Sequence, residues 1–188
     1  MKMISEYIDQ VLDIYYLDTE NQSVYNQDLD DWIEPDQKYI VRLKTKEGKR
    51  KGYSMATLYR LCDEGIFCND TTKSLEGEIW KEIPDTQGFY LASNKGRIKS
   101  LKGNQAKILK GTKNKAGYTR VDIRYTNAKG EHIRKTKFLH ILVAETFLGK
   151  QPGTDYQCHH IDKNKDNSQV DNLEWLNKSE HRKKHSYS

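Results

Sequence analysis

Long apolar runs are missing from this 188-residue chain, in which apolar residues make up 35% and charged residues 31%. No stretch approaches the roughly 18 apolar residues that a membrane span needs, and acids occur in residues 1–14, where a secretory signal would need an apolar segment. Cysteine is also scarce, because Cys62, Cys68 and Cys158 are odd in number and form no CxxC pair. This argues against a disulfide framework and a four-cysteine zinc site. We therefore expect an intracellular protein without membrane contact.

Charge is unevenly distributed along the sequence. Residues 1–79 contain 10 Lys and Arg against 16 Asp and Glu, whereas residues 80–188 contain 22 against 11. All six histidines also fall in the basic part, so we place a domain boundary within the polar stretch 69–78. A basic half of this size is expected of a polyphosphate binder, although a merely solvated surface would have the same composition.

The N-terminal part has the pattern of a small α+β module. Five apolar residues recur at helical spacing and predict one amphipathic helix: Ile4, Ile8, Val11, Leu12 and Tyr15. Residues 38–43 and 49–53 predict a hairpin around a glycine-containing turn, and residues 54–64 predict a short helix capped by Ser54 and ended by Gly65. The acidic run 28–36 is expected to be a solvated loop. Nothing here indicates catalysis.

A different pattern begins at residue 78 with EIWKEIPDTQGFYLASNKGRIKSL, residues 78–101. FYLAS and RIKSL predict two strands around a turn in which Asn94 and Gly96 suit positive φ. The segment strongly resembles the short motif that precedes many phage and intron-encoded HNH endonucleases. That resemblance implies a small hairpin that carries Lys95, Arg97 and Lys99 towards DNA.

Further basic residues follow in the segment KILKGTKNKAGYTRVDIR, residues 107–124. Lysines interleaved with short strands can follow a phosphate backbone, since each neutralised phosphate releases counterions. The candidate DNA contacts outside the hairpin motif are Lys113, Lys115, Arg120, Arg182 and Lys183.

The most apolar run of the C-terminal half is KTKFLHILVAETFLG, residues 135–149. We interpret its apolar side chains as core, namely Leu139, Leu142, Val143, Ala144 and Phe147. His140 lies inside this run and is expected to be a packed histidine rather than a ligand.

The stretch CHHIDKNKDNSQVDNLEWLNKSEHRKKH, residues 158–185, holds four of the six histidines. Hydrolysis of a phosphodiester needs an activated water and stabilisation of the leaving oxygen, which a neutral histidine and a divalent cation supply. His159 and His160 cannot share one face of a strand. The pattern predicts strand, loop, strand and helix, the helix beginning with a capping box of Asn177 and Glu180.

This stretch, together with the preceding motif, resembles the HNH, or ββα-metal, nucleases. The resemblance implies that His160 is the general base, that Asn172 orients the base and pins the loop, and that His159 and His181 are the metal ligands. Relatives often carry Asp or Asn at the two ligand positions, whereas both are His here. Mg²⁺ is the expected ion, and Mn, Ni or Zn are alternatives because imidazole also suits Zn, Ni and Cu. This sequence departs from the family pattern at Ile141, where Arg is usual, at Lys163, where Gly is common, and at Ser168, where Asn is common.

We therefore predict an α+β protein in which a small N-terminal α+β module, residues 1–75, serves specificity or protein contact. A DNA-binding hairpin motif, residues 78–101, and a ββα-metal (HNH) nuclease domain with hairpins, residues 102–188, follow. The resemblance implies a metal-dependent endonuclease of duplex DNA, encoded by a phage or mobile element of homing type and acting in the cytoplasm of a bacterial host. The alternatives are a non-catalytic DNA-binding or inhibitory protein on this scaffold, and a structural zinc module built on Cys158, His159, His181 and His185. The sequence gives no indication of oligomeric state.

Overall fold

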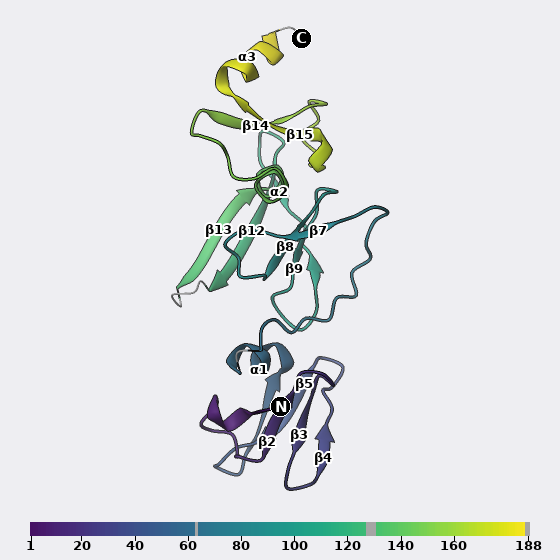
Figure 1. The fold of residues 1–188 in the computed structure, drawn as a ribbon, viewed down its shortest axis with the longest axis vertical. Coiled ribbons are helices and arrows are strands. Elements are labelled where there is room, and N and C mark those ends of the chain that lie inside the picture. The colour runs from purple at the N-terminus through teal and green to yellow at the C-terminus, as the bar shows by residue number, and fades with distance from the viewer. Residues whose placement is uncertain (63, 127–130, 187–188) are drawn as a thin grey trace. The chain divides into compact units, whose positions relative to one another are not determined.

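The computed structural model describes residues 1–62, 64–126 and 131–186, and it divides into two compact units (Figure 1). Unit 1 comprises Met1–Thr71 with Leu101–Ala106, and unit 2 comprises Thr72–Ser100 with Lys107–Ser188. Strands dominate both units and the α-helices are short, which confirms the α+β class. Among the described residues, no helix has the length and apolarity needed to cross a membrane.

Unit 1 is built from an antiparallel sheet, a hairpin and one helix. The sheet has the order β1-β2-β3-β4, with β1 (Lys2–Met3), β2 (Tyr15–Asp18), β3 (Ser23–Asn26) and β4 (Asp31–Ile33). The hairpin pairs β5 (Ile40–Lys44) with β6 (Arg50–Ser54), and α1 (Met55–Leu61) follows directly. The hairpin and the helix were predicted, and the Ser54 side chain accepts the predicted capping bond from the Thr57 amide at 3.2 Å. β4 lies within the acidic run 28–36, so the prediction of a loop there was wrong for three residues.

The predicted N-terminal amphipathic helix is absent from unit 1 as the structure describes it. A 3-10 helix, η1 (Ile4–Glu6), is followed by turns, Val11 forms an isolated bridge with Thr45, and β2 begins at Tyr15. The apolar spacing is real, because Ile4 and Val11 are fully buried. It is satisfied by turns and a strand rather than a helix, since β-branched and aromatic residues pack well on a sheet.

In unit 2, a second antiparallel sheet contains the hairpin motif. Its order is β10-β9-β8-β7, with β7 (Trp80–Glu82), β8 (Tyr90–Ser93), β9 (Ile98–Ser100) and β10 (Lys107–Ile108). The two predicted strands are therefore present as β8 and β9. In the turn between them Gly96 has φ +74°, as expected, whereas Asn94 is not among the residues with positive φ.

A three-stranded sheet and the longest apolar helix complete the core of unit 2. The strands are β11 (Thr112–Lys113), β12 (Thr119–Thr126) and β13 (His132–Phe138), and the helix is α2 (Leu139–Phe147). Leu142, Val143 and Ala144 are buried in α2, and Leu139 and Phe147 pack against them while partly exposed. The core prediction for this run is confirmed.

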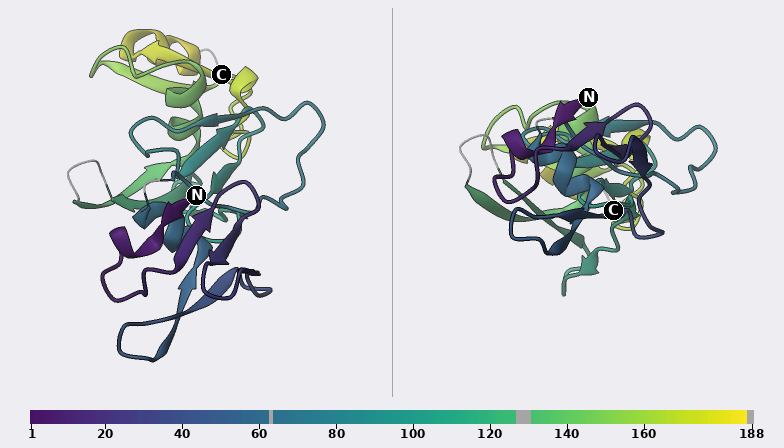
Figure 2. Two further views of the ribbon diagram at one scale, coloured as in Figure 1. Left: turned by 60° about the horizontal axis from the view of Figure 1, so that its bottom comes forward. Right: turned by 90° about the horizontal axis from the view of Figure 1, so that it is seen from below.

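The C-terminal segment has the predicted order of strand, loop, strand and helix. β14 (Tyr156–His160) pairs with β15 (Leu173–Asn177) through a loop ending in the 3-10 helix η2 (Val170–Asn172), and α3 (Lys178–Ser186) follows. The capping box is present, since the Glu180 amide donates to Asn177 Oδ1 at 2.9 Å and the Asn177 amide donates to Glu180 Oε2 at 3.1 Å. The left view of Figure 2 shows this segment by its green-to-yellow colour.

The compact units do not follow a single cut in the chain. After β9 the segment Leu101–Ala106 belongs to unit 1, where the Asn104 side chain donates to the Lys38 carbonyl at 2.7 Å and accepts from the Ala56 amide at 3.1 Å. The division into 1–75, 78–101 and 102–188 stays a prediction about roles.

Candidate active site

β14 carries two adjacent histidines whose rings have different neighbours. His159 lies opposite Glu174 in the β14–β15 register, and its ring meets the His181 ring of α3 edge-on, with centroids 5.1 Å apart. The ring of His160 lies 4.8 Å from His140 and 6.1 Å from Tyr118. The two histidines are therefore directed into different surroundings, as the alternation of a strand requires.

A small pocket of about 70 Å³ is lined by both histidines of β14 and by His181 of α3. Its lining comprises Tyr118, Cys158, His159, His160, Lys163, Lys165 and His181. Nε2 of His160 is buried and has no hydrogen-bond partner among the described residues. A buried polar atom without a partner is costly unless a water or ligand satisfies it, so this nitrogen marks the pocket as a binding position.

Burial sets the protonation state of His160. Loss of solvation lowers the pKa of its imidazole, Asp162 opposes this by raising it, and Lys165 lowers it further. The net shift is downward, so the ring is neutral at pH 7 and its unprotonated nitrogen can accept a proton.

His140 is a packed histidine, as predicted. It is 6% exposed and stacks on Phe138 with centroids 5.6 Å apart. Burial, followed by the neighbouring His160, lowers its pKa to about 4. His140 therefore supports the His160 ring as a neutral aromatic group.

Asn172 holds the loop between β14 and β15. Its side-chain amide donates to Asp162 Oδ1 and to the Asn167 carbonyl, both at 2.8 Å, and its Oδ1 accepts from the Asp162 amide at 2.9 Å. Its carbonyl accepts from the Ile161 amide at 2.9 Å. These bonds span the loop directly after His160. The role of Asn172 in pinning the loop thus has a geometric basis, whereas its role in orienting the His160 ring stays a prediction.

The turn between β8 and β9 closes against the same loop. The Val170 amide donates to the Asn94 carbonyl at 2.9 Å. A Cβ atom added to Gly96 would lie 2.9 Å from the carbonyl carbon and oxygen of Ser168. Only a residue without a side chain permits this approach, so the hairpin motif braces the loop that carries Asn172.

Sequence reasoning missed two contributors to the pocket, Tyr118 and Lys165. The Lys165 ammonium lies 4.7 Å from the centroid of the Tyr118 ring and donates to the Ala116 carbonyl at 3.0 Å. These contacts tie the turn between β11 and β12 to the loop. The only sequence signal was a lone tyrosine in a lysine-rich segment, which does not reveal a partner 47 residues away.

Two of the three basic residues in the hairpin motif are engaged within the protein. The Arg97 guanidinium forms an ion pair with Glu78, whose side chain is fully enclosed, and lies 5.3 Å from the centroid of the Trp80 ring. Lys99 is 3% exposed, with its ammonium 4.1 Å from the centroid of the same ring. Lys95 is half-buried in the turn. Their assignment as DNA contacts stays a prediction, and the geometry of Arg97 and Lys99 favours a structural role.

The Glu78 carboxylate is strongly stabilised in its charged form. Burial raises its pKa, but hydrogen bonds from Arg97, Ser93 and the Leu75 amide outweigh this and bring the pKa to about 2. The ion pair therefore fastens the start of the motif to its turn.

The remaining predicted DNA contacts are exposed. Lys115, Arg182 and Lys183 lie on the surface, and Arg120 does so with its guanidinium carbon 5.2 Å from the centroid of the Phe138 ring. Lys113 is also exposed, but its ammonium lies 2.7 Å from Asp166 of the loop.

The predicted metal ligands His159 and His181 come together from β14 and α3. Neutral imidazoles are good ligands for divalent ions, so these two side chains would hold the predicted ion. No group of three or more His, Cys, Asp or Glu side chains suited to a metal occurs in the described part of the chain. Burial raises the pKa of the Cys158 thiol to about 12, which disfavours the thiolate that the zinc module needs, and the His185 side chain lies outside the described residues.

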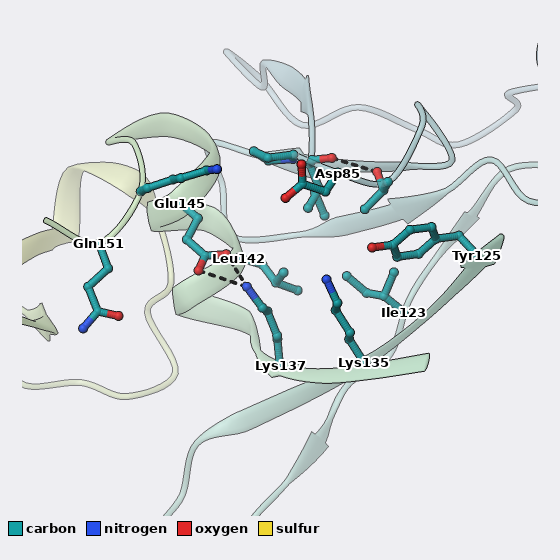
Figure 3. Close-up of a pocket in the computed structure, with 12 residues that line it drawn as sticks. Asp85, Ile123, Tyr125, Lys135, Lys137, Leu142, Glu145 and Gln151 are labelled. Atoms are coloured by element: carbon teal, nitrogen blue, oxygen red, sulfur yellow. Dashed lines mark hydrogen bonds and ion pairs between the residues drawn. The ribbon is translucent and has the colours of Figure 1, made fainter. Parts of the chain in front are cut away.

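A larger pocket of about 220 Å³ lies elsewhere in unit 2, beside α2 and β13 (Figure 3). Ile83, Ile123 and Leu142 line its apolar part, and the Lys137 ammonium forms an ion pair with Glu145 at 2.7 Å. No histidine or cysteine lines it among the described residues. Its lining therefore lacks a histidine that would act as a general base in the way predicted for His160.

Comparison with known proteins agrees with this geometry. A family model described as the NUMOD4 motif matches residues 78–124, and one described as HNH endonuclease matches residues 137–183. The chain therefore contains a NUMOD4 motif followed by a segment that matches the HNH endonucleases. The predicted family is thereby confirmed, and the NUMOD4 segment is the part that includes the Glu78–Arg97 ion pair, the Gly96 turn and Tyr118.

Several relatives cover the same region. The uncharacterised HNH endonuclease L247 of Acanthamoeba polyphaga mimivirus is 39% identical over 110 residues, which are 57% of this chain and 26% of that protein. The DNA endonuclease I-HmuI of Bacillus phage SP01 is 38% identical over 98 residues, 52% of this chain and 51% of the relative. A solved structure on DNA binding and cleavage by the HNH homing endonuclease I-HmuI is similar with a TM-score of 0.49 and 33% identity, covering 58% of each chain. This HNH protein thus spans about a quarter to a half of the curated relatives it matches.

Proposed function

We propose that this HNH protein is a divalent-metal-dependent endonuclease that hydrolyses phosphodiester bonds in duplex DNA. The observation that carries the proposal is the buried, unpartnered Nε2 of His160 in a pocket shared with His159 and His181. The name of the similar I-HmuI protein, a DNA endonuclease, supports DNA as the substrate. A homing type and a phage or mobile-element origin, with action in a bacterial cytoplasm, are part of the same proposal.

His160 acts as the general base. Its lowered pKa keeps it neutral at physiological pH, so Nε2 can take a proton from the attacking water. The neutral, buried His140 ring and the Tyr118 ring pack beside the imidazole, with centroids 4.8 Å and 6.1 Å from that of His160. Deprotonated water then attacks phosphorus, and the cleaved strand retains a 5′-phosphate.

His159 and His181 would hold one divalent ion, for which Mg²⁺ is our first choice and Mn, Ni and Zn are alternatives. Such an ion neutralises charge that develops on the phosphate and the leaving oxygen. Asn172 keeps the loop after His160 closed through its bonds to Asp162 and Asn167. The exposed Lys115, Arg182 and Lys183 would neutralise phosphates of the bound duplex.

A plasmid cleavage assay tests this function. The purified chain should nick or linearise supercoiled DNA with Mg²⁺, Mn²⁺, Ni²⁺ or Zn²⁺, and His160→Ala should lower the rate by on the order of 10²-fold or more with little change in DNA affinity. His132→Ala removes an exposed histidine from β13 and is the matched control. Cleavage by the His160 variant at the wild-type rate would reject the assignment of the base.

A further inference from the structure

The charge of unit 1 is segregated more sharply than the halves of the chain suggest. Residues 1–36 contain ten acids and a single basic residue, Lys2. Residues 42–51, RLKTKEGKRK, contain six basic residues and one acid. The acidic sheet β1–β4 is therefore followed by a strongly basic hairpin, β5–β6.

The register of this hairpin gathers positive charge on one face. Lys44 lies opposite Arg50, and Arg42 lies opposite Gly52. All four are exposed, whereas Val41 and Leu43, which alternate with them, are buried in the core of unit 1. The alternation of β5 thus fixes its basic side chains outward.

Internal acids neutralise little of this charge. Arg42, Lys46 and Lys49 lie 3.5–3.6 Å from Asp36, Asp13 and Glu47, respectively. The side chains of these three pairs are 37–80% exposed, and exposed ion pairs contribute little. Lys44 and Arg50 have no acidic partner within the residues that the structure describes. These two cations are available to an external anion.

Gly52 lies opposite Arg42 on this face and is exposed. A Cβ atom added to Gly52 would lie 3.2 Å from Ile40 Cγ2, so the glycine leaves room for that side chain within unit 1.

We propose that the β5–β6 hairpin is a second duplex-DNA contact, in which Arg42, Lys44 and Arg50 grip the phosphate backbone. The proposal rests on the nuclease function given above and adds a binding site in a unit that lacks the candidate catalytic residues. A two-stranded ribbon is narrow enough for the roughly 12 Å major groove. The acidic sheet of the same unit repels DNA, which restricts the duplex to the hairpin.

The test measures affinity of the full chain for a 40-base-pair duplex by fluorescence anisotropy at several KCl concentrations. Lys44→Gln with Arg50→Gln should reduce the slope of log affinity against log salt by about 1.8, because each lost phosphate contact contributes about 0.9. At 0.1 M salt the affinity should fall by about 60-fold, roughly eightfold for each contact. Lys44→Arg should retain binding, and Lys38→Gln, an exposed charge just outside the hairpin, should leave the slope within about 0.3 of wild type.

Three outcomes would overturn the proposal. An unchanged slope in the double variant, with wild-type protein that binds and cuts, rejects the hairpin contact and leaves the nuclease function intact. Wild-type protein that neither binds nor cuts rejects both. If light scattering shows that wild-type protein is dimeric and the double variant monomeric, with equal DNA affinity, the hairpin contacts the acidic sheet of a second copy instead.

Discussion

Replacing Gly96 with alanine should damage the candidate active site from a distance. Gly96 has φ +74°, a conformation that costs an L-residue roughly 1–2 kcal/mol. The new Cβ would also lie 2.9 Å from the Ser168 backbone and 3.2 Å from its Cβ, so the loop must shift, at about 1–3 kcal/mol. We expect a total loss of about 2–5 kcal/mol in the free energy of unfolding.

Gly77→Ala is the matched control for this substitution. Gly77 has φ +63°, yet an added Cβ meets nothing within 4 Å. It therefore carries the backbone strain without the clash and should lose only about 1–2 kcal/mol. Urea denaturation at pH 7 measures both variants, and plasmid cleavage at a temperature where both remain folded reports the loop. Equal losses of stability and unchanged cleavage by the Gly96 variant would refute the claim that the hairpin motif braces the loop.

Three further predictions concern the groups around that loop. The folded pKa of Glu78 is about 2, below its ordinary value of 4.5, so its contribution to stability is complete above pH 4.5 and is lost as pH falls towards 2. Glu78→Gln should therefore be less stable than wild type at pH 7 by about 2 kcal/mol. In urea titrations, the difference in stability between the two proteins should shrink as pH falls from 4.5 towards 2. Lys163 has φ +61°, so Lys163→Gly should raise the urea midpoint by an amount equivalent to about 0.5–1 kcal/mol, and a lower midpoint would mean that its side chain contributes more than the strain costs. EDTA should stop cleavage without lowering the melting temperature, and His159→Ala should weaken divalent-ion binding measured by calorimetry; unfolding on chelation would instead indicate a structural metal.

The sequence was most informative where local chemistry decides the structure. The alternation in β14, the capping box of α3 and the apolar run of α2 follow from spacing and hydrogen-bonding capacity alone. The first 15 residues were mispredicted because their apolar spacing suits a helix as well as it suits turns leading into a strand. Long-range pairings, such as the bridge from Val11 to Thr45 and the pairing of β1 with β2, decide between them.

Long-range contacts account for most of what the sequence did not reveal. Arg97 and Lys99 are residue types expected in a DNA-binding hairpin. In the structure, however, Arg97 pairs with Glu78, and the Lys99 ammonium lies over the Trp80 ring. Likewise, the contact of Lys165 with Tyr118 joins loops that are far apart in the chain. Such pairings depend on how strands meet across the fold, which residue type and local period do not encode.

The return of Leu101–Ala106 to unit 1 has a consequence for how this protein can be divided or recombined. The chain passes between the units three times, after residues 71, 100 and 106, rather than once. A recombination event that joined unit 2 to a foreign N-terminal segment at residue 72 would remove the partners of Asn104. Its side chain bonds to Lys38 and Ala56 of unit 1. Inheritance of the two units as a linked pair is therefore favoured, and a functional exchange of unit 1 must carry the short segment between β9 and β10 with it.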